Sequence, residues 1–162
     1  MIFAGIVIVF AAADLFLKWV IEKQDPGQFP KPLPKSGGKI WLYRNHNAGF
    51  PFGFLDQYGE LVRTLPLIVT SALGGIFCYL LREKGSTAKK AGLALILGGS
   101  ISNLYDRYFR RYVVDYFSFR FGWLKKVVFN LGDLCVFAGS GILMGFEAVS
   151  EVREALRKRK GK

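Results

Sequence analysis

Four long apolar blocks, separated by charged stretches, dominate the sequence. A helix needs about 20 mostly apolar residues to cross a hydrocarbon core of about 30 Å, so blocks of this length predict transmembrane helices. We expect spans at approximately residues 2–21, 64–81, 91–106 and 127–146. Ala11-Ala12-Ala13 resembles the cleavage site of a signal peptide, but no positively charged segment precedes Ile2. We therefore expect the first block to remain as a helix.

The third block differs from the others in being short and rich in small residues. Its glycines and serines are Gly92, Gly98, Gly99, Ser100 and Ser102. Small side chains let helix backbones approach closely within lipid. The composition therefore predicts that this helix packs in the middle of a bundle.

Strand-forming residues occur in two of the connections, 22–63 and 107–126. Residues 39–44 and 112–119 are rich in aromatic and β-branched side chains, which favour strands. We therefore expect one domain, residues 1–162, of the all-α membrane class: a four-transmembrane-helix bundle with a small extracytoplasmic β element.

Basic residues set the predicted orientation and partners. Lysines and arginines crowd the turn at 82–90 and the tail at 153–162, which lie on one side in a four-span topology. The positive-inside rule makes that side, with both termini, cytoplasmic. The net charge of +11 in a soluble protein would favour nucleic acid, but here the cations flank apolar blocks. We therefore expect membrane lipid, and no nucleic acid, as the partner of this charge.

No metal or organic cofactor is expected. Cys78 and Cys135 both fall inside apolar blocks, and His46 is the single histidine. A zinc site needs about four closely spaced ligands. The cysteines are better explained as small buried apolar residues.

Two ionisable residues interrupt the first block. Asp14 and Lys18 are four positions apart, so they share a helix face and can pair. Charges at membrane depth cost about 2.5–3.5 kcal/mol on insertion scales, which makes each one a candidate functional residue. The two interpretations of Asp14 and Lys18 are a structural ion pair and a direct role in substrate binding.

Polar residues also mark the end of the third block and the start of the fourth. Asn103, Asp106 and Arg107 share one helix face, and Asn130 and Asp133 repeat the spacing. The third block ends and the fourth begins on the same side of the membrane. We therefore expect these groups to converge at one depth.

Asp115 lies in the strand-like segment at that same side, 18 residues before Asp133. Two aspartates that meet in a poorly hydrated site share a proton and become one base and one acid. Such a pair could activate water against a peptide bond. The alternative is a loop aspartate on a solvated face.

The segment 45–53 combines turn residues with aromatics. Asn47 could bind an extended peptide through its amide, and Gly49 and Gly53 would let that backbone come close. The alternative is an ordinary turn with a buried aromatic anchor. His46 is expected to be solvated or to cap a turn.

These segments, taken in order, resemble the bacterial lipoprotein signal peptidases, also called signal peptidase II. The matching motifs are Asp14-Leu-Phe-Leu-Lys18, Asn47-Ala-Gly49-Phe-Pro-Phe52-Gly53, Gly98-Gly99-Ser-Ile-Ser-Asn103-Leu-Tyr-Asp106-Arg107, Val113-Val114-Asp115-Tyr-Phe117 and Phe129-Asn130-Leu-Gly-Asp133. The resemblance implies an aspartic endopeptidase of the bacterial inner membrane. It would cleave diacylglyceryl-modified prolipoproteins before the lipidated cysteine, near the extracytoplasmic face.

The resemblance also implies roles for individual residues. Asp115 and Asp133 would be the catalytic pair. The residues that would line or support the substrate site are Asp14, Lys18, Asn47, Gly49, Gly99, Asn103, Arg107 and Asn130, with Asp106 as structural support. Gly132, where the family commonly has alanine, is expected to loosen a helix start, and Phe50-Pro51 replaces commonly small residues.

Two other classes of protein remain as alternatives. A small proton- or cation-coupled transporter would use Asp14, Lys18, Asp106 and Asp133 to line a path through the bundle. The ionisable groups gather toward one face of the membrane rather than across its full depth, which disfavours a transporter. A non-catalytic membrane adaptor would instead use the basic tail.

Overall fold

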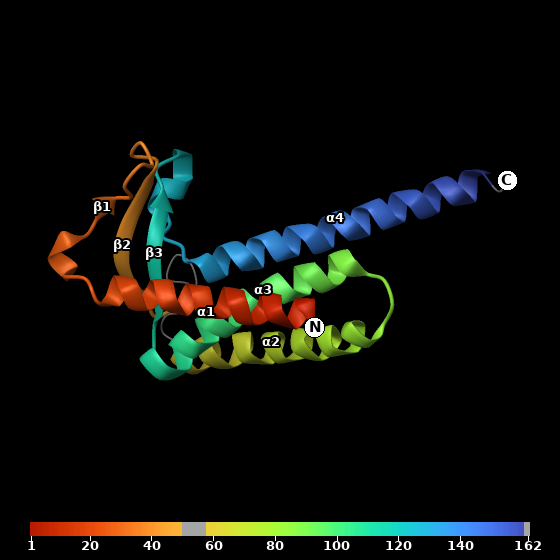
Figure 1. Ribbon diagram of the computed structural model, residues 1–162, viewed down its shortest axis with the longest axis horizontal. Helices are drawn as coiled ribbons and strands as arrows, with labels where there is room; N and C mark the ends of the chain where they lie inside the picture. Colours follow the sequence, from red (N-terminus) through yellow and green to blue (C-terminus); the bar gives the residue numbers. More distant parts are fainter. Residues whose placement is uncertain (50–57, 161–162) are drawn as a thin grey trace.

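The computed structural model describes residues 1–49 and 58–160. Its long helices are α1 (Ile2–Glu22), α2 (Gly59–Arg82), α3 (Thr87–Tyr105) and α4 (Leu131–Lys160). The helices lie side by side, and a small sheet stands at one end of them (Figure 1). The fold is thus mostly helical with a small β element, as predicted.

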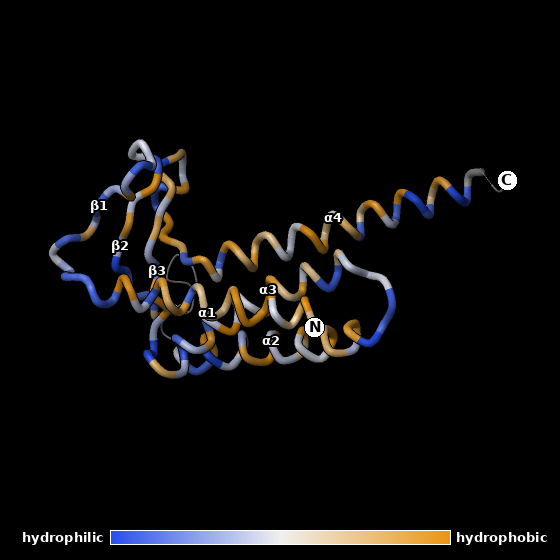
Figure 2. The backbone as a smooth tube through the Cα atoms, viewed as in Figure 1, coloured by the Kyte–Doolittle hydropathy of each residue, from blue (hydrophilic) through white to orange (hydrophobic). Residues whose placement is uncertain are grey.

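Three of the described helices, α1, α2 and α4, are long and apolar enough to cross a membrane. Hydrophobic residues run along most of their length, while polar residues gather at the sheet and at the α2–α3 turn (Figure 2). The central helix α3 is not among the three. Lysines 89 and 90 occupy its first turn, and its glycines and serines lower its hydropathy.

Helix α4 departs from its predicted bounds at both ends. It begins at Leu131 rather than near residue 127, because Phe129 pairs with the strand residue Phe117 through backbone hydrogen bonds. It continues past residue 146 to Lys160. Polar segments support a helix through pairs four residues apart, such as Glu154 with Lys158, and hydrophobicity does not detect them.

Helix α3 lies at the centre of the bundle and contacts α1, α2 and α4. Its closest approach is to α4, where two glycine pairs face each other. A Cβ at Gly92 would lie 2.9 Å from the Gly139 oxygen, and one at Gly99 would overlap the Gly132 oxygen. The two pairs are one heptad apart in both helices, which therefore run antiparallel in close backbone contact. This confirms the central position predicted from the small residues.

A methyl group at Gly99 is expected to destabilise the fold. Overpacking of this kind costs about 1–3 kcal/mol, and each kcal/mol corresponds to roughly 2–4 °C in Tm for a chain of this size. Gly99→Ala should therefore melt several degrees below wild type in detergent. Gly141→Ala is the matched control, because a Cβ there meets open space. Equal melting temperatures for the two variants would contradict the close contact.

The sheet has the order β1 (Lys31–Pro32), β2 (Ile40–Asn47) and β3 (Val113–Phe119), and both pairings are antiparallel. Both predicted strand segments are confirmed, with β2 extending to Asn47. An irregularity between Leu42 and Asn45 shifts the register, so that Asn45 lies opposite Asp115 and Asn47 opposite Val113. Val114 and Tyr116 pack with Ile21 at the end of α1. The sheet is thereby fixed against the helices, close to the start of α4.

Candidate active site

Asp133 lies in the first turn of α4, where it and Asn130 cap the helix reciprocally. The Asp133 N–H donates to Asn130 Oδ1 at 2.8 Å, and the Asn130 N–H donates to Asp133 Oδ2 at 3.1 Å. This capping box satisfies two of the amide groups that a helix start leaves without partners. The carboxylate of Asp133 is therefore held in one orientation.

Asp115 contacts the same asparagine from the sheet. The side chain of Asn130 donates to Asp115 Oδ1 at 2.8 Å, and the side chain of Asn47 donates to Oδ2 at 3.1 Å. Only 4% of Asp115 is exposed. The structure thus brings the two candidate carboxyl groups to opposite sides of Asn130 in a buried site.

Burial, and after it the negative charge of Asp133, raise the pKa of Asp115 to about 7. The amides of Asn47 and Asn130 oppose this rise, since they donate to the ionised form. Asp115 therefore retains a proton up to about pH 7. A neutral carboxyl group beside a second carboxyl group is what acid–base chemistry on a peptide bond requires.

Asn103 links Asp133 to the first helix. Its side-chain amide donates to Asp133 Oδ1 at 3.0 Å, and its carbonyl oxygen accepts from Lys18 Nζ at 2.8 Å. Each contact fixes which way the amide points. Asn103 thus donates and accepts between helices, as predicted.

Lys18 is the centre of a buried ion network. Its Nζ lies 3.0 Å from Asp14 Oδ2 and 3.0 Å from Asp106 Oδ2, and all three side chains are fully buried. Asp106 Oδ2 also accepts from the Val114 N–H at 3.1 Å. Of the two alternatives for Asp14 and Lys18, the geometry favours the structural ion pair, which here extends to Asp106 and fixes α1, α3 and β3.

Sequence reasoning missed two further partners of Asp14. Ser102 donates to Asp14 Oδ2 at 2.6 Å, and the Tyr116 hydroxyl donates to Oδ1 at 2.9 Å. The N–H of Leu131 also donates to Oδ1, at 3.0 Å, which fixes the start of α4. The four-residue spacing of Ser102 and Asp106 was an available signal for the first partner. Nothing in the local pattern indicated Tyr116.

Asn47, Gly49 and Arg107 meet at the end of β2. Asn47 Oδ1 accepts from the Gly49 N–H at 3.1 Å, which closes a tight Asx turn. Arg107, in the π-helical turn η3 (Asp106–Arg110), donates to the Gly49 carbonyl at 3.0 Å. These contacts tie the start of the loop to Asp115. The predicted loop residues Phe50, Pro51 and Gly53 lie outside the described residues.

Gly132 lies in a crowded position beside the network. A Cβ there would come within 2.9 Å of both Asp14 Oδ2 and the Gly99 oxygen. An alanine would therefore require its neighbours to move. Close packing explains glycine at this position, and the loosening of the helix start stays a prediction.

His46 is half-exposed, pairs with Glu22 at 2.8 Å and stacks on Tyr112. The contacts of the His46 ring are thus with Glu22 and Tyr112 rather than with the aspartates. This agrees with the expectation that His46 is a solvated or capping residue.

Comparisons with known proteins agree with this arrangement. A family model described as "Signal peptidase (SPase) II" matches residues 6–148. The lipoprotein signal peptidase of Sulfurihydrogenibium sp. is 30% identical over 149 residues, which are 90% of each chain. That of Shewanella oneidensis is 30% identical over 141 residues, covering 86% of this chain and 81% of the relative.

A solved bacterial membrane enzyme has the same fold. It superposes with a TM-score of 0.68 at 18% identity, covering 95% of this chain and 92% of its own. At that identity the likeness supports the fold alone. The extent of the family match and of the 30% identical relatives decides the assignment: this chain belongs to the signal peptidase II family of bacterial membrane enzymes, and it is an aspartic peptidase.

Proposed function

We propose that this peptidase removes signal peptides from diacylglyceryl-modified prolipoproteins, cleaving before the lipidated cysteine. The relatives from Shewanella oneidensis and Haemophilus influenzae are named lipoprotein signal peptidases, and they support this substrate class. The observation that carries the proposal is the buried pair of carboxyl groups that share Asn130. The named relatives give no support to the alternative transporter.

The two aspartates have different roles in the reaction. Asp115 holds the shared proton and polarises the scissile carbonyl, while Asp133 takes a proton from the attacking water. Asp133 is assigned the ionised role because it lies at the N-terminus of α4, where the helix dipole favours a negative charge. When the tetrahedral intermediate collapses, the proton gained by Asp133 passes to the leaving amine.

The remaining site residues support this pair. Asn103 and Asn130 orient Asp133, and Asn47 orients Asp115. Arg107 fixes the backbone at Gly49, just after the end of β2. Asp14, Lys18 and Gly99 hold the helices together, so their contribution to substrate binding is indirect.

The topology we propose has four spans in one domain, residues 1–162. Helix α3 joins the three apolar helices as the fourth span, since it is 19 residues long and packs among them. Both termini then lie in the cytoplasm, and the aspartates lie near the extracytoplasmic face. The scissile bond beside a membrane-embedded diacylglyceryl group would reach them at that depth.

The direct test is cleavage of a synthetic prolipoprotein by purified protein in lipid nanodiscs. Two substrates with the same peptide sequence are compared, one with a diacylglyceryl group on the cysteine and one without. We expect cleavage before the cysteine of the lipidated substrate alone, as read by mass spectrometry. Equal cleavage of both substrates, or none by folded protein, would contradict the proposed substrate class.

The pH dependence of cleavage follows from Asp115. Since its pKa is about 7, the neutral form is lost as the pH rises through 7. We expect kcat to fall about tenfold per pH unit above this point, measured with saturating lipidated substrate. A rate that stays constant to pH 9 would show that no neutral Asp115 is needed.

The same group makes stability depend on pH. Between the ordinary carboxyl value of 3.8 and about 7, the folded protein keeps a proton that the unfolded chain releases. The unfolded state therefore binds fewer protons, and stability falls as the pH rises through this window. Asp115→Asn should lose this part of the dependence, which melting in detergent at pH 5 and pH 8 would reveal.

A further inference from the structure

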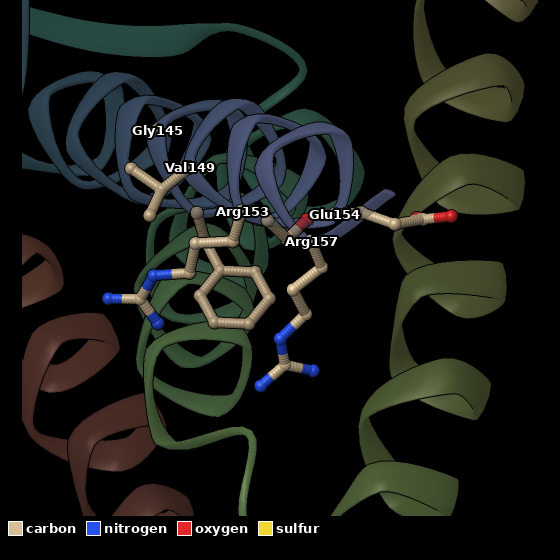
Figure 3. A pocket seen from close by; sticks show the side chains of 7 residues that line it. Gly145, Val149, Arg153, Glu154 and Arg157 are labelled. Carbon is tan, nitrogen blue, oxygen red and sulfur yellow. The ribbon is translucent and has the colours of Figure 1, made fainter. Parts of the chain in front are cut away.

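The C-terminal half of α4 carries a groove that the catalytic site does not use. Gly145, Val149, Arg153 and Arg157 are spaced four residues apart and form one row along the helix. They line a cavity of about 730 Å³ together with Phe146, Ser150 and Glu154 (Figure 3). This groove is apolar at its Gly145 end and cationic at its Arg157 end.

The two arginines extend from the same side of α4 (Figure 3). Two carboxylates of this part of α4 are already paired, Glu147 with Lys89 and Glu154 with Lys158, each at 2.6 Å. Within residues 1–49 and 58–160, no carboxylate lies within ion-pair distance of Arg153 or Arg157. The cationic end of the groove is therefore suited to an external anion.

The position of the groove along α4 places this charge at a membrane surface. Arg153 follows Asp133 by 20 residues, or about 30 Å at about 1.5 Å per residue. A hydrocarbon core is also about 30 Å thick. With Asp133 near one interface, the arginines lie at the opposite one, and Gly145 lies about two helical turns before Arg153, at the edge of the hydrocarbon.

The apolar end has room for an acyl chain. A Cβ at Gly145 would meet nothing within 4 Å. Val149 is 51% exposed and Met144 73% exposed. Apolar surface inside the membrane, continuous with cations at headgroup depth, matches the two parts of a phospholipid.

We propose that this groove binds one anionic phospholipid, with an acyl chain along Gly145 and Val149 and the phosphate at Arg153 and Arg157. The inference depends on α4 crossing the membrane and not on the cleavage reaction. Its occupant is a lipid rather than a soluble anion, because a soluble anion would use only the cationic end. It is anionic rather than zwitterionic, because Glu154, the carboxylate that lines the groove, is already paired with Lys158, and the charge at the two arginines is positive.

Native mass spectrometry of the detergent-solubilised protein tests the proposal. Phosphatidylglycerol and phosphatidylcholine with the same acyl chains are compared as added lipids. The wild-type protein should retain phosphatidylglycerol in preference to phosphatidylcholine. Arg153→Gln with Arg157→Gln should weaken that binding about 30-fold, since each cation near an anionic surface contributes about a factor of five. The control variant, Lys125→Gln with Lys126→Gln, removes the same charge from exposed residues elsewhere. It should change phosphatidylglycerol binding little.

Two further measurements separate the possible occupants. Gly145→Leu fills the apolar end without a clash and should weaken phosphatidylglycerol binding while leaving the arginines in place. Inorganic phosphate at millimolar concentration should not displace the lipid. Equal retention of the two lipids, unchanged binding by the arginine variant or by Gly145→Leu, or displacement by phosphate would each overturn the proposal. Retained peptidase activity shows that the arginine variant is folded.

Discussion

Replacement of Asp133 or Asp115 by asparagine is expected to lower kcat for lipidated substrate by about 10⁴-fold. Asparagine has nearly the shape of aspartate but can neither take the proton from water nor return it. The double variant should lose little more than either single variant, because the two groups act as a unit. Single-turnover cleavage in nanodiscs measures the rates of the two single variants and the double variant.

Asp25→Asn is the matched control for these variants. Asp25 is exposed and accepts a hydrogen bond from the Gly27 N–H in the short turn η1 (Pro26–Gln28), outside the active site. Its replacement should leave kcat unchanged. A folded Asp115→Asn or Asp133→Asn variant with near-normal turnover would remove that residue from the catalytic pair.

Replacement of Lys18 by methionine is expected to destabilise the protein by about 3–5 kcal/mol. Lysine and methionine are similar in length, so packing changes little. The loss is electrostatic, because Asp14 and Asp106 would remain buried without the cation that lies 3.0 Å from each. The melting temperature in detergent should fall by about 6–20 °C, at roughly 2–4 °C per kcal/mol.

Lys158→Met is the control for charge removal. Its partner Glu154 and Lys158 itself are well exposed, and such pairs contribute about 0–1 kcal/mol. Addition of Asp14→Asn to Lys18→Met should recover part of the lost stability, because the buried charge of Asp14, whose ion-pair partner is Lys18, is then removed. Asp106 is a poorer choice, because it also pairs with Arg110 at 3.1 Å. A Lys18→Met protein that melts like wild type would show that the network is not stabilising.

Much of the fold could be predicted from local patterns. Strand-forming and aromatic residues placed a strand at 112–119, where β3 covers Val113–Phe119, and small residues placed α3 at the centre of the bundle. The end of α4 could not be predicted from hydrophobicity, because its last turns are polar. Length and hydropathy also do not establish α3 as a span, since a helix enclosed by others needs little apolar surface of its own.

The site could be predicted only within each element. Spacings of three and four residues placed Asn103 with Asp106 and Asn130 with Asp133 on common faces. The contacts between elements, such as Tyr116 with Asp14 across 102 positions, depend on how helices and strands pack. Helical periodicity has no information about such distant pairs, so the extent of the Lys18 network was not foreseen.

The two glycine pairs between α3 and α4 limit how the enzyme can move. Interlocking at Gly92–Gly139 and again at Gly99–Gly132 blocks sliding of one helix along the other, since each backbone sits against its partner at two separate levels. Asn103 and Asp133 therefore keep their alignment through a catalytic cycle. Helix α2 has no such constraint: its helix contacts are mainly with α3, and a Cβ at its glycines Gly74 and Gly75 would meet nothing within 4 Å. The glycine contacts therefore fix α3 against α4, the two helices that carry Asn103 and Asp133, and not against α2.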